Sequence, residues 1–478
     1  MPLLFVGTYG EKLGHVDGKG KGIYVLRFDR ETLSIQADTQ RLRPFFGQPQ
    51  LGGAEGFTNP TFLTTFRNAQ GRLDLYVAEE SHSAAGFIAA VAVDEATGEL
   101  RRKGEAVPSG TDEAMPAACC HVSVTPGGKH VLAANYLSGS VVAVARRDDG
   151  TLDGASVQHV RLPPAEHPVA FPLPNAARQE MSHAHMALVS AGTHSTTVLV
   201  PDLGADIVWS IPYDGANAAS PLGTPVPTAS HPALAGFGPR HVALHPTEPF
   251  CYVAYELASA VAAFKIDRRT GAIVGAPVGV VCALEGVASK FLKGEDEAFG
   301  GAKLPSGWTV GASKAYAHFV GESPNDWTSI GRPGHGRSTC DDKATSVAAV
   351  VVAPDASHVL VSSRIVGKPG VLSAVPLTAS GMFVDDVDRP VRITSTLGRC
   401  PRDFTMLPAL ESSAVSRKRA RRVDSGLADA DSLPQAATLA IVANQDDDKI
   451  VVVCEGGLAQ PLTEEVPTPV CLCWAPPA

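Results

Sequence analysis

The stretch GFGPRHVALHPTEPFCYVAYE, residues 236–256, contains two short strands separated by a turn. The segments HVALH and FCYVAYE are enriched in β-branched and aromatic residues, and PTEP at 246–249 supplies a tight turn between them. Arg240 and His241 open the first strand, and Glu256 closes the second. Antiparallel pairing places the start of one strand beside the end of the other, so we expect a base and an acid to meet at the open end of this hairpin.

The same strand–turn–strand pattern recurs along the chain. Six pairs of strands show it, and they open near Asn59, Cys119, His183, Arg240, Thr345 and Arg402. Most pairs are followed by another apolar strand, such as SVVAVARRDDGTL at 140–152 or AVAAFKIDRRTGAI at 260–273, so each unit contains about four strands. Repeated four-stranded units are typical of β-propeller blades, whose radial closure leaves few exposed sheet edges.

The sequence therefore predicts an all-β fold, a seven-bladed β-propeller of four-stranded blades with two irregular insertions. The seventh blade is shared: FVGTYG at 5–10 and GIYVLRFD at 22–29 join strands from the C-terminal end and close the ring. A two-domain α/β fold would need amphipathic helices between the strands, and the sequence has no convincing ones. We expect a single propeller domain over residues 1–478, with insertions at about 285–343 and 408–435.

The second insertion contains a basic run, SRKRARR at 416–422. Such a run could be a nuclear-import signal or an anion-binding patch. A solvated disordered loop explains the same charges without a receptor, and we favour it.

Composition restricts the class of protein. With 46 Gly, 37 Pro and only 19% charged residues, the chain suits many short strands and turns better than long surface helices. Its net charge of −9 argues against non-specific binding to nucleic acid or to an anionic membrane. The nine cysteines form no CxxC framework, the start has no basic leader and no apolar span has transmembrane length. We therefore expect a soluble cytoplasmic protein with reduced cysteines, and the sequence makes no prediction of its oligomeric state.

Polar residues cluster at the open ends of the hairpins, and a common orientation would gather them around one mouth of the central channel. They are Asn59, Glu79, Glu80, His121, Asn135, His183, His185, Asp202, Arg240, His241, Glu256, Arg364, Arg402, Asp403 and Asn444. Many of them could simply cap backbone groups, as polar residues at strand ends often do.

Two of these arginines come from nonadjacent hairpins. Arg240 and Arg364 facing one channel would form a strong site for phosphate or carboxylate. Glu256 could be a catalytic group or merely the ion-pair partner of Arg240. His183 and His185 lie on the same face of a strand, and HxH can ligate a metal. Because no third ligand is evident, we predict no metal and no cofactor, and expect one histidine to carry a proton.

Several motifs resemble the lactonase family of seven-bladed β-propellers. They are HAH followed by VPDLGADIV, GFGPRHVALHP with CYVAYE, VVAPDASHVLVSSR, and GRCPRDF with IVANQ. The resemblance covers all but the two insertions, and it implies a site on one face with His185, Arg240, Glu256 and Arg364 as catalytic residues. One departure concerns Arg364, which here lies in Ser-Ser-Arg-Ile where the family typically has Ser-Asn-Arg-Gly. As substrate-binding residues we expect His121, Asn135, His183, Asp202, His241, Arg402 and Asn444.

The resemblance also implies an activity. The implied activity is that of a carboxylic-ester hydrolase, a lactonase acting on a small anionic sugar lactone similar to 6-phosphogluconolactone. Such an activity implies a role in carbohydrate metabolism, in the pentose phosphate pathway. In hydrolysis, the arginines would hold the anionic group and polarise the lactone carbonyl, while Glu256 or His185 takes a proton from water. The same family includes cyclases of carboxy-muconate, and the sequence does not separate the two reactions. A non-catalytic propeller scaffold for protein–protein interaction is the third alternative, to which an aromatic content of 6% lends little support.

Overall fold

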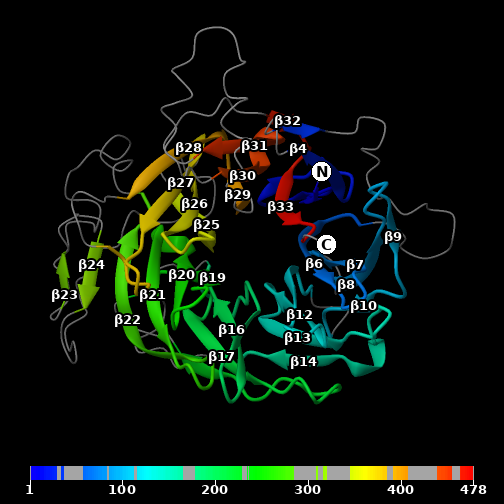
Figure 1. The fold of residues 1–478 in the computed structure, drawn as a ribbon, viewed down its shortest axis with the longest axis horizontal. Coiled ribbons are helices and arrows are strands. Elements are labelled where there is room, and N and C mark those ends of the chain that lie inside the picture. Colours follow the sequence, from blue (N-terminus) through cyan, green and yellow to red (C-terminus); the bar gives the residue numbers. More distant parts are fainter. Residues whose placement is uncertain are drawn as a thin grey trace, which may run out of the picture.

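Seven antiparallel sheets are arranged in a ring around a central axis in the residues that the computed structural model describes (Figure 1). These are residues 2–29, 34–36, 57–82, 86–111, 116–164, 178–228, 234, 236–284, 308–310, 316–319, 345–365, 367–384, 391–406, 439–454 and 463–476. The predicted seven-bladed propeller is confirmed, and its blades are numbered below in chain order.

Blade 1 joins the two ends of the chain and contains β33 (Pro469–Trp474), β1 (Leu3–Thr8), β4 (Tyr24–Asp29) and β5 (Ser34–Gln36). Blade 2 contains β6 (Pro60–Arg67), β7 (Leu73–Glu79), β8 (Phe87–Val93) and β10 (Val107–Pro108), with β9 (Leu100–Arg102) also paired to β8. Blade 3 contains β11 (Cys119–Val124), β12 (His130–Asn135), β13 (Ser140–Ala145) and β14 (Gln158–Arg161). Blade 4 contains β15 (Leu188–Ala191), β16 (Thr196–Asp202), β17 (Ile207–Tyr213) and β18 (Val226–Thr228).

Blade 5 contains β19 (Pro239–Leu244), β20 (Phe250–Tyr255), β21 (Ala260–Ile266) and β22 (Ile273–Cys282), extended by β24 (Tyr316–Phe319) and β23 (Trp308–Val310). Blade 6 contains β25 (Thr345–Val352), β26 (His358–Ile365), β27 (Lys368–Pro376) and β28 (Arg392–Arg399). Blade 7 contains β29 (Pro401–Met406), β30 (Leu439–Asn444), β31 (Lys449–Cys454) and β32 (Thr463–Glu465). Outside the blades, β2 (Lys12–Leu13) pairs with β3 (Val16–Asp17), and short 3-10 turns occur at η1 (Gly154–Ser156), η3 (Glu256–Ala258) and η7 (Gln445–Asp447).

All six predicted hairpins pair as antiparallel neighbours, and the shared blade closes by pairing β1 with β33. The hairpin of blade 4 is looser than the others, because β15 begins only at Leu188 and an isolated bridge before it joins Ala184 to Asp202, the last residue of β16. The first insertion is not wholly irregular, since β23 and β24 extend the sheet of blade 5. The second insertion, at 408–435, and the basic run within it lie outside the described residues.

Apolar side chains fill the gaps between neighbouring blades. Tyr76, Ala78 and Ile88 of blade 2, for example, pack against Val131 and Val142 of blade 3, and all five are fully buried. Central strands are therefore buried on both faces, which explains their continuous runs of apolar residues. Burying each large aliphatic side chain contributes about 1.5–3 kcal/mol.

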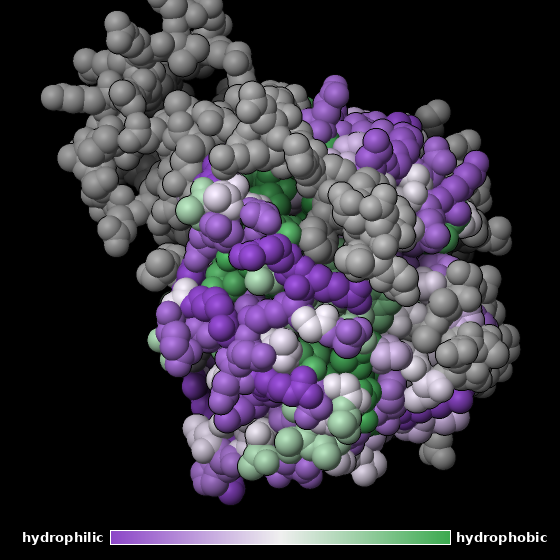
Figure 2. Space-filling view, turned by 90° about the vertical axis from the view of Figure 1, so that its right-hand side faces the viewer, coloured by the Kyte–Doolittle hydropathy of each residue, from purple (hydrophilic) through white to green (hydrophobic). Residues whose placement is uncertain are grey.

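The outer edge of the ring differs from its interior. Figure 2 shows the side near β9 and β10, where hydrophilic residues dominate and hydrophobic atoms appear mainly in the recesses between them. Among the described residues, no helix is long and apolar enough to cross a bilayer. The free thiols are Cys119, Cys120, Cys251, Cys282, Cys400, Cys471 and Cys473.

Candidate active site

Most inner strands begin with an irregularity that inserts one residue into the strand pairing. The register shifts between Pro60 and Phe62 in β6, and equivalent shifts occur at the start of β11, β19, β29 and β33. The inserted residues are Thr61, Cys120, Arg240, Arg402 and Val470. A bulge of this kind re-aims a side chain, and here the repetition turns one side chain per blade toward the same point.

These five residues line one small cavity at the centre of the ring. The complete lining is Thr61, Phe62, Glu80, Cys120, His185, Arg240, His241, Arg402, Asp403 and Val470. The cavity volume of about 20 Å³ suits a single water molecule. Its lining therefore combines cations, carboxylates and imidazoles around a space of one solvent molecule.

Beside this cavity, three arginines converge on Glu256. Arg240 Nε lies 2.8 Å from Oε2 of Glu256. Arg364 and Arg178 approach the other oxygen, Oε1, with distances of 3.2 and 3.1 Å from their Nη2 atoms. The side chains of Arg240 and Glu256 are 4% and 3% exposed, whereas those of Arg364 and Arg178 are 17% and 23% exposed. The cluster thus has a buried inner part, formed by Arg240 and Glu256, and a solvent-facing rim, formed by Arg178 and Arg364.

The backbone fixes this cluster. Arg240 Nη1 donates to the carbonyl of Ala348 at 2.6 Å, and Arg364 Nη2 donates to the carbonyl of Val347 at 3.1 Å. Both carbonyls belong to β25, the inner strand of blade 6. Glu256 begins η3, directly after β20, and its backbone N–H donates to Gly238 at 2.8 Å. Blades 5 and 6 therefore position the cluster together.

The charges within the cluster determine the ionisation of its members. Burial tends to raise the pKa of Glu256, but Arg364, Arg178 and Arg240 outweigh it and hold the pKa well below its usual range. Burial also lowers the pKa of Arg240 to about 10, opposed by Glu256. At neutral pH the cluster consequently contains three guanidinium ions and one carboxylate.

Three buried histidines surround the inner side of the cluster. Burial and the charge of Arg240 hold the pKa of His185 and of His241 well below 6.5, and lower that of His121 to about 3. His241 contacts Arg240 Nη1 at 3.1 Å, and its ring lies 5.4 Å from that of His185 and 6.2 Å from that of His121. These imidazoles are therefore neutral at pH 7.

A second charged network lies across the cavity, where blades 7, 1 and 2 meet. The Tyr9 hydroxyl donates to Oε2 of Glu80 at 2.7 Å and accepts from Arg402 Nη2 at 2.9 Å. His82 contacts the other oxygen of Glu80 at 2.8 Å. Burial tends to raise the pKa of Glu80, but His82 and Arg402 lower it to about 2. Arg402 is therefore paired with Glu80 and does not belong to the arginine cluster at Glu256.

The structure brings most of the predicted site residues together. His185, Arg240, His241 and Arg402 line the central cavity, and Glu256 and Arg364 lie in the arginine cluster. The ring of His121 contacts that of Phe62 at a tilt and meets that of His241 edge-on.

His183 lies at the edge of this group. Its ring stacks on that of Tyr136, with centroids 4.3 Å apart, and its Nε2 contacts Glu180. The partners of its two ring nitrogens are the Tyr136 carbonyl and the Glu180 carboxylate. Among the described residues, no group of three His, Cys, Asp or Glu side chains could hold a metal ion.

Three other predicted substrate-binding residues do not join this group, because they hold the backbone. Asn135 donates to the Ser109 carbonyl and Asn444 to the Thr396 carbonyl, which ties each blade to its neighbour. Asp202 accepts from the backbone of His183 and from the Trp209 indole. All three side chains are 0% exposed.

Sequence reasoning missed three residues here. Arg178 precedes the HAH motif in a stretch without strand periodicity, and Tyr136 follows Asn135 in a turn. Tyr9 was identified only as part of a strand segment. The signal that could have found Tyr9 and Tyr136 is their position, since each directly follows the second strand of its blade, as Glu256 does.

Comparison with known proteins gives one family. Residues 3–285 match the family described as "Lactonase, 7-bladed beta-propeller". The 6-phosphogluconolactonase of Bacillus subtilis (strain 168) is 30% identical over 270 residues, which are 56% of this chain and 63% of that protein. That of Cronobacter sakazakii is 28% identical over 159 residues, 33% of this chain and 40% of that protein. The match thus spans less than two thirds of either relative. The solved structure of the periplasmic gluconolactonase PpgL of Pseudomonas aeruginosa is similar in fold, with a TM-score of 0.61, 21% identity and 99% of both chains covered.

Proposed function

Because this chain belongs to the lactonase family of seven-bladed β-propellers, we propose that it is a lactonase, a carboxylic-ester hydrolase that opens a small anionic sugar lactone of the 6-phosphogluconolactone type. The observation that carries the proposal is the convergence of Arg178, Arg240 and Arg364 on the single carboxylate of Glu256. The Bacillus and Cronobacter relatives bear the name of this activity.

The charge of the cluster favours an anionic substrate. Three guanidinium ions and one carboxylate leave a net charge of 3 − 1 = +2. The neighbouring histidines add none, because burial and Arg240 hold the pKa of His185 and His241 well below 6.5. A phosphate monoester carries about −1.5 to −2 charges at pH 7, so its charge complements that of the site.

Within this proposal, Glu256 is a positioning residue. Both oxygens of its carboxylate are engaged by guanidinium groups, and Glu256 is not among the residues that line the water-sized cavity. Its role is to hold the guanidinium groups in place before the substrate arrives. Such preorganised cations can stabilise the oxyanion that develops on the lactone carbonyl, an effect worth about 3 kcal/mol per donor in other hydrolases.

His185 is the proposed general base. It lines the cavity beside Arg240, and the cavity has room for the attacking water. In the proposed reaction, water adds to the lactone carbonyl as His185 takes its proton. The ring C–O bond then breaks, and the leaving oxygen receives a proton to give the hydroxy acid. A bound phosphate dianion would raise the pKa of His185 by offsetting the arginines, so the substrate itself would strengthen the base.

A turnover assay tests the proposal. The rate of ring opening of 6-phosphogluconolactone is measured from the protons released and compared with the spontaneous rate, for the full chain and for the Arg240→Met variant. Catalysis by the wild type that is lost in the variant supports the proposal. The absence of acceleration would reject hydrolysis of that lactone, and lactonisation of a carboxy-muconate in a parallel assay would assign the cyclase reaction instead.

The proposed reaction yields a phosphorylated aldonic acid, which places the protein in carbohydrate metabolism and specifically in the pentose phosphate pathway. We propose the cytoplasm as its compartment, supported by the free thiols among the described residues. Fractionation of native cells with an antibody against the chain tests this, and recovery from a periplasmic fraction, as the name of the Pseudomonas structure indicates for that protein, would reject it.

A further inference from the structure

We infer that Arg178 and Tyr136 bind the phosphate of the substrate and make the site selective for a phosphorylated lactone over an uncharged one. This inference rests on the proposed function. It divides the arginines into two sets, with Arg178 and Arg364 directed to the phosphate and Arg240 to the lactone carbonyl.

Exposure supports this division. The side chains of Arg178 and Arg364 are 23% and 17% exposed, and their Nη2 atoms share Oε1 of Glu256. Arg240 is bound below them to Oε2 and lines the water-sized cavity with His185. A ligand arriving from solvent therefore meets the two outer guanidiniums first, and the reacting group lies deeper.

Tyr136 supplies a second donor at the rim. Nε and Nη2 of Arg178 donate to its hydroxyl oxygen, at 3.3 and 3.1 Å. Since the oxygen accepts from both groups, the hydroxyl proton can point to another acceptor. Burial raises the pKa of Tyr136 to about 12, so the proton is present at neutral pH.

Ring contacts connect this rim to the proposed base. The Tyr136 ring stacks on His183 at 4.3 Å and meets the edge of His185 at 5.5 Å. Arg178 is thereby fixed relative to His185 through a single aromatic side chain. A phosphate held at the rim would place the attached sugar ring over the cavity.

Equilibrium binding gives the first test, because it does not require turnover. The Kd of 6-phosphogluconate, of gluconate and of inorganic phosphate is measured by calorimetry for the wild type and for Arg178→Gln, Arg178→Lys and Tyr136→Phe. We expect Arg178→Gln to raise the Kd of the phosphorylated acid by about 10- to 100-fold and to leave that of gluconate nearly unchanged. Arg178→Lys keeps the charge, and serves if the Gln variant does not fold. Arg268→Gln, which changes an exposed arginine paired to Glu248, is the matched control.

Kinetics give the second test. The ratio of kcat/KM for 6-phosphogluconolactone to that for glucono-δ-lactone should fall about 10- to 100-fold in Arg178→Gln. An unchanged ratio together with an unchanged Kd for the phosphorylated acid would overturn the inference. If the wild type turns over neither lactone but Arg178→Gln still weakens phosphate binding, the proposed function fails and the phosphate site stands.

Discussion

Arg240 Nε lies 2.8 Å from Oε2 of Glu256, and both side chains are almost completely buried at the junction of blades 5 and 6. A buried ion pair contributes little net stability when intact, because desolvation opposes the attraction between the charges. Removing one partner is costly, since the other charge then remains buried alone. The pair therefore constrains the arginines more than it stabilises the fold.

Replacing Glu256 with Gln should destabilise the protein. Three guanidinium ions would lose the carboxylate that they share, and we expect the free energy of unfolding to fall by about 3–5 kcal/mol, measured by urea denaturation. Added phosphate should restore more stability to this variant than to the wild type, because the anion replaces the missing charge. The control is Glu248→Gln, which breaks the exposed pair with Arg268 and should cost less than about 1 kcal/mol. Equal losses in the two variants would contradict the prediction.

The proposed base makes a prediction about pH. Burial and Arg240 hold the pKa of His185 well below 6.5, so the imidazole is already unprotonated near neutrality. The kcat/KM for glucono-δ-lactone, an uncharged substrate whose own ionisation does not enter the profile, should stay constant between about pH 6 and 8 after correction for the spontaneous reaction and decline only in more acidic solution.

His185→Asn should lower kcat/KM by about 100- to 10,000-fold. His245→Asn, at a hairpin turn of blade 5, is the control. A titration near pH 6.5 in the wild type, or full activity of His185→Asn, would remove His185 from the role of base.

The hairpins could be predicted from sequence because each one is local. In the pair that contains Arg240 and Glu256, strand periodicity and a tight turn fix the register within about 20 residues, and the structure confirms the pairing. Contacts between blades are different. The contact between Arg364 and Glu256 depends on how blade 6 packs beside blade 5. The repeated pattern alone predicted only that polar residues of different hairpins lie at the same face of the ring.

Other features were not predictable, for physical reasons. Arg178 reaches the cluster from a segment without strand or helix periodicity, so no pattern indicated its direction. Asn135 and Asn444 looked similar to the other polar residues at strand ends, but their amides donate to carbonyls of adjacent blades. A bulge of one residue, such as the one at Cys120, decides which residue at a strand end faces the centre of the ring. The alternation of apolar and polar residues in the sequence does not reveal such an insertion.

Glu79 should make stability depend on pH. Burial raises the pKa of its carboxyl to about 8 from 4.5, although its Oε1 accepts from the backbone of Thr58 and Asn59. Between these two values the folded state binds the proton and the unfolded state releases it, so this group makes the protein less stable as pH rises. In Glu79→Gln, the side-chain carbonyl oxygen can still accept the hydrogen bonds from the backbone of Thr58 and Asn59, but the side chain no longer titrates.

Urea denaturation at pH 5.5 and 8.5 measures this effect. The wild type should lose more stability between the two conditions than Glu79→Gln, by a few kcal/mol. Glu465→Gln, at a site away from this carboxyl, is the control and should retain the wild-type slope. Parallel pH curves for the wild type and Glu79→Gln would contradict the prediction.

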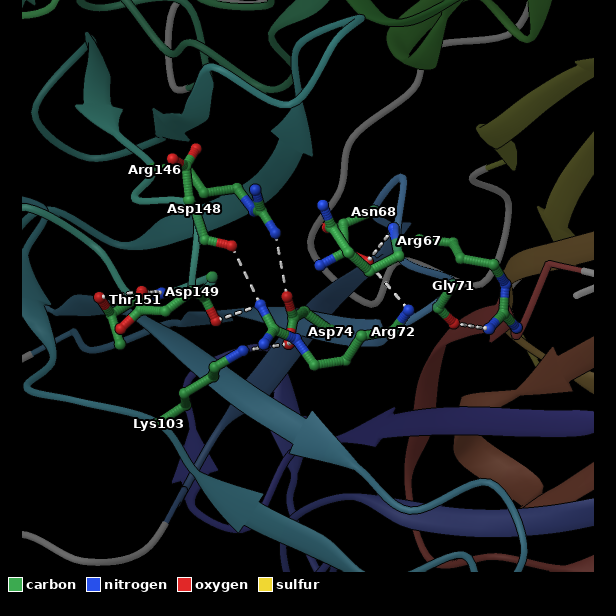
Figure 3. A network of polar contacts seen from close by, with 12 residues as sticks. Arg67, Asn68, Gly71, Arg72, Asp74, Lys103, Arg146, Asp148, Asp149 and Thr151 are labelled. Atoms are coloured by element: carbon green, nitrogen blue, oxygen red, sulfur yellow. Dashed lines mark hydrogen bonds and ion pairs between the residues drawn. The ribbon is translucent and has the colours of Figure 1, made fainter.

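A last prediction concerns Asp74, a fully buried carboxylate that joins blades 2 and 3 (Figure 3). Its Oδ1 accepts from Lys103 Nζ at 2.5 Å, and its Oδ2 accepts from Arg146 Nη2 at 3.0 Å. Gly150 packs so closely that a Cβ there would lie 2.2 Å from Oδ2. The carboxylate is thus enclosed by cations and backbone near the start of β7, whose other end leads to Glu79 and Glu80 beside the central cavity.

Asp74→Asn should leave the cations without a countercharge and lower the free energy of unfolding by about 3–5 kcal/mol. Below the unfolding temperature, kcat/KM for the lactone should match that of the wild type, because the residues around Glu256 are unchanged. The exposed pair of Arg147 and Asp153 offers a matched control: Asp153→Asn retains the cap of η1 and should cost less than about 1 kcal/mol. Urea denaturation and lactone turnover on the same samples separate the two effects. Loss of activity in folded Asp74→Asn would show that this contact between blades also positions the site.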